Sequence, residues 1–135
     1  PFVLSNVIGG AITILVAVGV LLVFNSGEQT IASMWTKSIT TAFALQIAPE
    51  IGGLPALAAA IIMFTGIFGA IMAPPLFKLC GITSAPAQGC SLGITAHAVG
   101  TSKALELGSE QGAFAALSMS FMGVLCAFAL PFLLA

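Results

Sequence analysis

Three long apolar stretches alternate along the chain with two segments in which apolar and polar residues are mixed. Residues 2–24, 54–77 and 112–135 contain no charged side chain. A helix of such a length rises roughly 33–36 Å, which is enough to cross a hydrocarbon core of about 30 Å. The pattern therefore predicts three full transmembrane helices. Pro74-Pro75 is expected to stop or kink the second of them near its end.

The two intervening segments, residues 29–49 and 86–107, predict a different structure. They are apolar on average, but they contain lysine, histidine and glutamate together with many hydroxyl side chains and glycines. Residues of these kinds in mid-segment leave backbone groups free, and a membrane tolerates this only where the backbone is buried in protein or lines a wet cavity. We expect two broken or re-entrant helical segments, non-helical near Lys37 and near residues 97–100. A polar helix or loop at the membrane surface is the alternative.

The same two segments belong to an internal repeat of about 60 residues. When the sequence is shifted by 60, residues 37–57 align with residues 97–117 with seven identities in 21 positions. Lys37 then falls opposite His97. Interrupted segments at matching positions of two repeats indicate a transporter binding site. Re-entrant segments would make the repeats inverted, whereas complete crossings would make them parallel, and the sequence leaves both open.

Composition excludes several classes of protein. Of 135 residues, 59% are hydrophobic and 5% charged, against roughly a quarter charged in soluble domains. Three lysines cannot neutralise a phosphate track, so no nucleic-acid partner is expected. High hydrophobicity with low net charge is the reverse of a disordered chain. We expect an all-α polytopic membrane protein with a single transmembrane domain over residues 1–135. Because the sequence runs from Pro1 directly into an apolar stretch, we expect a fragment.

His97 is the only histidine of the sequence, within Thr95-Ala-His-Ala-Val-Gly-Thr101. Imidazole has an unperturbed pKa near 6.5, so it is the natural proton carrier at neutral pH. An ionisable group at membrane depth is a functional hypothesis by default. The alternative is a neutral histidine bonded to a backbone carbonyl. We expect no metal site, since the sequence has no second histidine and no aspartate to complete a shell.

Lys37 is followed closely by three hydroxyl side chains, those of Ser38, Thr40 and Thr41. An ammonium and three hydroxyls can hold a small anion, and free backbone N–H groups nearby would add partial positive charge. The alternative is a lysine that extends its ammonium to the membrane surface. Because Lys37 lies in the middle of its segment, its ammonium would reach the membrane surface less easily, and a binding role is favoured.

Structural roles are expected for several of the other charged residues. Glu50 and Glu110 are expected as carboxylates at helix starts, where the helix dipole and free N–H groups favour them. Lys103 and Glu106 are three residues apart and predict a local ion pair. No Gly-x-Ser-x-Gly motif accompanies the serines, so we expect neither an enzyme nor a cofactor.

Several of these motifs together resemble the C-terminal part of the LrgB/CidB family of membrane proteins. They are Lys37-Ser-Ile-Thr-Thr41, Glu50-Ile-Gly-Gly-Leu-Pro-Ala-Leu57 and Ala96-His-Ala-Val-Gly-Thr101. The likeness covers nearly the whole chain and leaves about three N-terminal spans of the family without a counterpart. One departure is Ala42, where the family pattern would place a proline after the two threonines.

The resemblance implies two functions. One is an antiholin-like regulator of murein hydrolase activity and lysis, with a small LrgA/CidA-type partner in a bacterial inner membrane. The other is a transporter of small carboxylates such as glycolate, glycerate or pyruvate, with a plastid inner envelope as the alternative location. Cations, hydroxyls and interrupted helices suit the carboxylate, so we favour the transporter, which would contact the lipid bilayer and could form a homo-oligomer. In it Lys37 binds the anion, His97 carries a coupled proton, and the substrate site combines Lys37, Ser38, Thr40 and Thr41 with Thr95, His97, Gly100 and Thr101.

Overall fold

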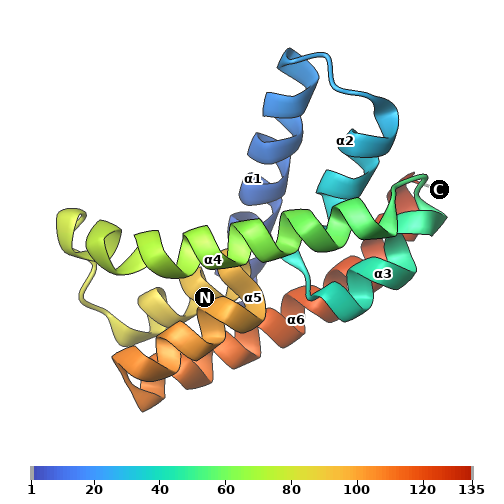
Figure 1. Cartoon of the computed structure of the whole chain (residues 1–135). Coiled ribbons are helices and arrows are strands. Elements are labelled where there is room, and N and C mark those ends of the chain that lie inside the picture. Colours follow the sequence, from blue (N-terminus) through green and yellow to red (C-terminus); the bar gives the residue numbers. More distant parts are fainter. Residues whose placement is uncertain (1, 135) are drawn as a thin grey trace.

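The computed structural model describes residues 2–134, which fold into helices joined by short turns (Figure 1). In chain order the elements are α1 (Phe2–Val23), α2 (Glu28–Trp35), the short 3-10 helix η1 (Thr36–Ser38), α3 (Thr41–Glu50), α4 (Pro55–Leu79), α5 (Ala85–Leu107) and α6 (Ser109–Leu134). The described residues contain no strand. The expected all-α class is therefore confirmed.

Three helices, α1, α4 and α6, are long and apolar enough to cross a membrane. They coincide with the three uncharged stretches of the sequence. α6 begins at Ser109, ahead of its uncharged stretch, so the charged residue Glu110 lies within its first turn.

Pro74 and Pro75 do not end α4, which continues to Leu79. Of the two expected effects, stopping or kinking the helix, the first does not occur. A proline removes the hydrogen bond of its own nitrogen and crowds the carbonyl four residues before it, and membrane helices tolerate this where neighbouring groups satisfy the freed carbonyl. The last turn of α4 is intact, since the N–H of Cys80 donates to the carbonyl of Leu76 at 2.9 Å.

Helix α5 lies at the centre of the packing, against both α4 and α6 (Figure 1). α1 lies across the direction of α4, and α2 returns beside α1. One buried apolar cluster includes Ile39 and joins α1, α3, α4, α5 and α6. A second includes Leu92 and joins α4, α5 and α6. Through these two clusters the interrupted segments pack against all three long apolar helices.

Helices α5 and α6 approach closely because two glycines of α5 face the backbone of α6. A Cβ atom on Gly89 would collide with the carbonyl of Gln111, and one on Gly93 with the carbonyl of Ala115. Small residues spaced four apart allow this kind of helix contact in membrane proteins, where packing replaces the hydrophobic effect.

The substitution Gly93→Ala is therefore expected to destabilise the protein by about 1–3 kcal/mol, the usual effect of overpacking a close contact. Thermal unfolding of the purified protein in detergent measures it. Gly19→Ala in α1 is the matched control, since a Cβ there would meet nothing within 4 Å, and it should keep or slightly raise the unfolding temperature. Equal unfolding temperatures for the two variants would contradict the close α5–α6 contact.

The backbone leaves the α-helical path at the two places where the sequence predicted it. After α2 the chain forms η1, and Ile39 and Thr40 are extended before α3 begins. Within α5, His97 has φ 47° and ψ −125°, so α5 consists of two helical stretches that meet at this residue. The re-entrant arrangement of these segments in a bilayer, and the internal repeat, stay predictions.

The bend in α5 at His97 is sharp. In a continuous helix, residues eight apart are separated by about 12 Å. Here a Cβ on Gly100 would collide with the carbonyl of Leu92, so the second stretch of α5 turns back against the first. On the other side, a Cβ on Gly69 of α4 would lie 2.8 Å from the Cβ of Ala96. The positive φ of a non-glycine residue costs energy, and packing on both sides of His97 holds it in place.

Candidate anion-binding site

The short helix η1 lies in the middle of the molecule and contacts all six α-helices. Its three residues, Thr36, Lys37 and Ser38, are buried. Lys37 is only 7% exposed, although its side chain ends in a charged ammonium group. The ammonium is therefore surrounded by protein, and the alternative of a lysine that reaches out to the surface does not fit this position.

The ammonium of Lys37 has one polar neighbour among the described side chains. Its Nζ donates to Ser38 Oγ at 3.1 Å. The Ser38 hydroxyl lies 3.4 Å from Thr13 Oγ1 on α1, and Thr13 Oγ1 also donates to the carbonyl of Gly10 at 2.9 Å. The result is a line of three polar groups from Lys37 to α1.

Lys37 has no carboxylate partner within residues 2–134. All four glutamates of the chain are exposed, and the ion pair found in this part joins Lys103 to Glu106 at 2.7 Å. A buried charge is stable only when it is paired and hydrogen-bonded. A protonated Lys37 would therefore leave an uncompensated positive charge at this site, which a bound anion would neutralise.

His97 is 2% exposed, and neither of its ring nitrogens makes a hydrogen bond of good geometry with a described residue. Helix η1, which contains Lys37, packs against α5, which contains His97. Buried, unpartnered nitrogens are costly, so a ligand between Lys37 and His97 would satisfy both groups.

The two backbone interruptions place helix starts beside these side chains. α3 begins at Thr41, and Thr40 before it makes no side-chain capping bond. The second stretch of α5 begins directly after His97. The first N–H groups of a helix have no partner within their own helix, and such groups favour anions.

The structure brings together three of the eight predicted substrate-site residues: Lys37, Ser38 and His97. The threonines of α5 bond to their own helix, Thr95 Oγ1 to the carbonyl of Ser91 at 2.7 Å and Thr101 Oγ1 to that of His97 at 2.8 Å. Gly100 packs within α5, and the half-buried Thr40 and Thr41 make no side-chain hydrogen bond with a described residue. The role of these other five residues stays a prediction.

The predicted position of Glu50 is wrong. It is the last residue of α3 and is exposed, and α4 starts only at Pro55. A turn with Gly52 at φ 79° separates the two helices. The N–H of Leu54, which precedes α4, donates instead to Ser33 Oγ at 2.8 Å.

The remaining charged residues lie where the sequence placed them. Glu110 is in the first turn of α6, and Lys103 and Glu106 form the expected ion pair. The side chains of these residues are at least partly exposed at the surface.

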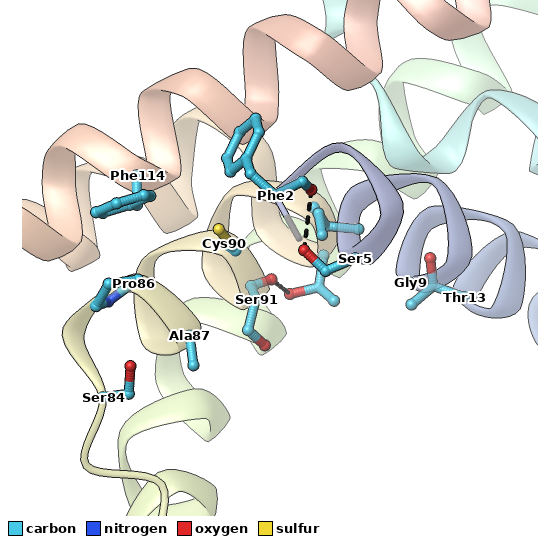
Figure 2. Close-up of a pocket in the computed structure, with 12 residues that line it drawn as sticks. Phe2, Ser5, Gly9, Thr13, Ser84, Pro86, Ala87, Cys90, Ser91 and Phe114 are labelled. Atoms are coloured by element: carbon cyan, nitrogen blue, oxygen red, sulfur yellow. Dashed lines mark hydrogen bonds between the residues drawn. The ribbon is translucent and has the colours of Figure 1, made fainter.

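Sequence reasoning missed the part that α1 plays. A pocket of about 710 Å³ lies between α1 and the first stretch of α5, and Thr13 of α1 is among its lining residues (Figure 2). Ser5, Gly9 and Thr13 recur every four residues and all line it. Residues four apart share one face of a helix. The spacing of these small and hydroxyl-bearing residues could therefore have indicated a functional face on α1, although the stretch as a whole is apolar and uncharged.

Comparison with known proteins gives a consistent result. A sequence model described as the LrgB-like family matches residues 1–135. The holin-like protein CidB of Staphylococcus epidermidis is 34% identical over 84% of this chain and 50% of its own length. Two uncharacterised Bacillus subtilis proteins are also similar: YwbG, 33% identical over 98% of this chain and 59% of its own length, and YxaC, 39% identical over 78% and 46%. The chain thus spans about half the length of these curated relatives. No solved structure matches.

Proposed function

Because this chain belongs to the LrgB-like family, we propose that it supplies the anion-binding part of a membrane transporter for small carboxylates of two or three carbons. The observation that carries the proposal is the buried ammonium of Lys37, which has a serine hydroxyl but no carboxylate beside it among the described residues. A substrate carboxylate would be the missing counter-ion. Three long apolar helices and bacterial relatives make this a multi-pass bacterial membrane protein, and we place it in the inner membrane.

His97 suggests how binding could be linked to protons. An imidazolium beside Lys37 would repel the ammonium while the site is empty, and a bound carboxylate would remove that repulsion. Substrate binding would then favour protonation, and by linkage protonation would favour substrate binding. This reciprocity is what proton-coupled uptake requires.

A second function is favoured by the names of the relatives, several of which are called holin-like proteins. In that function the protein would regulate murein hydrolase activity and lysis together with a small LrgA/CidA-type membrane partner. It would need no substrate. A buried, unpaired lysine beside an unpartnered histidine has no evident use in it.

Uptake by reconstituted vesicles separates the two functions. Vesicles containing the whole protein should accumulate labelled glycolate or pyruvate under an inward proton gradient, whereas protein-free vesicles and labelled glycerol serve as controls. The alternative function predicts no carboxylate accumulation, and pore formation would release a large trapped dye. Absence of uptake for both acids in vesicles that retain the dye would contradict the transporter.

A further inference from the structure

We infer that the pocket between α1 and α5 is the entrance through which a small anion reaches Lys37, and that Thr13 is the residue at which pocket and binding site meet. This inference rests on the proposed transport function. It adds α1 to the site, so that this helix has a role in transport besides spanning the membrane.

The first observation is the shape and lining of the pocket. Its volume of about 710 Å³ falls within the range of roughly 300–1,000 Å³ typical of small-molecule sites, so a carboxylate of two or three carbons would fit together with water. Figure 2 shows Ser5, Gly9 and Thr13 following one another along α1, with Cys90 and Ser91 on α5. None of the lining residues is charged.

The second observation is the position of Thr13. It is half-buried and lines the pocket. Its Oγ1 lies 3.4 Å from the hydroxyl of Ser38, which is 1% exposed and accepts a hydrogen bond from Lys37 Nζ at 3.1 Å. A continuous line of polar groups therefore runs from the pocket wall to the buried ammonium.

The chemistry of the lining suits passage more than retention. A conducting path must admit its ligand without holding it too tightly. The hydroxyls of Ser5, Thr13 and Thr95 already donate to carbonyls of their own helix, so the lining offers a carboxylate few hydrogen bonds and no fixed cation. The five hydroxyls of the pocket belong to Ser5, Thr13, Ser84, Ser91 and Thr95. Tight binding is then left to Lys37 at the inner end.

Native cysteines provide the test. Cys90 lines the pocket, whereas Cys80 is exposed and is not part of the lining. In the whole protein, a variant that keeps Cys90 as its single cysteine should react with the anionic reagent 2-sulfonatoethyl methanethiosulfonate. The mixed disulfide would put a sulfonate in the pocket, and carboxylate uptake should fall at least about tenfold. The matched variant that keeps Cys80 alone should react without loss of uptake.

Two substitutions of Thr13 complete the experiment. Thr13→Val keeps the shape but removes the hydroxyl, and uptake should fall by up to about tenfold, the usual effect of losing one hydrogen bond between neutral groups. Thr13→Ser restores the hydroxyl and should recover uptake. If wild type transports carboxylate but Cys90 is unreactive, or its modification leaves uptake unchanged, the entrance is wrong while the proposed function stands. If wild type moves no carboxylate, both fail.

Discussion

Replacing Lys37 with alanine is expected to abolish carboxylate binding and uptake. The substitution removes the ammonium that is buried without a carboxylate partner in the described chain, at the point where the substrate would supply one. Losing one member of a buried, hydrogen-bonded charge pair costs about 2 kcal/mol or more, which corresponds to at least about a 30-fold weaker affinity. Isothermal titration of glycolate or pyruvate into the purified whole protein measures this change.

Lys78→Ala is the matched control for this experiment. Both substitutions remove one positive charge, but Lys78 is exposed in the last turn of α4, where water and salt weaken its field. Binding should change by no more than about twofold. Similar losses for the two variants would show that net charge, and not the position of Lys37, governs binding, and the site would be misplaced.

Replacing His97 with glutamine is expected to separate binding from proton coupling. Glutamine is polar and of similar size, but it cannot take up a proton near neutral pH, as imidazole can. The variant should retain part of its carboxylate binding and lose the response of uptake to an imposed pH gradient. Initial uptake rates in vesicles with and without the gradient measure the difference.

Equal gradient-driven accumulation in wild type and the His97→Gln variant would contradict the coupling role. His97 would then be a structural residue of the bend in α5, and the glutamates would be the next groups to examine. Loss of binding with a normal unfolding temperature would give a different answer, namely that the ring itself contacts the substrate.

The parts of the fold that could be predicted from the sequence are those that depend on the length of apolar stretches and on the kinds of residue within each segment. Uncharged stretches of sufficient length predicted α1, α4 and α6, because length and apolarity alone decide whether a helix can span a membrane. A cation among glycines and hydroxyls at matching repeat positions predicted the breaks near Lys37 and His97. The same alignment set these two residues opposite each other, and the structure places them as neighbours.

What the sequence could not provide depends on packing between distant segments. Pro74 and Pro75 predict a stop or a kink, and local propensity alone does not decide between the two. Glu50 was assigned to a helix start because the turn that contains Gly52 was not recognised. The contact of Thr13 with Ser38 joins residues 25 apart in sequence, and only the crossing of α1 over η1 brings them together.

The contacts of η1 also bear on how the protein could change shape. Transporters expose one site alternately to the two sides of the membrane by rocking one group of helices against another. Because η1 contacts every α-helix, a shift of any of these helices would alter the surroundings of η1. Any such rocking would therefore change the contacts of η1 and, with them, the surroundings of Lys37.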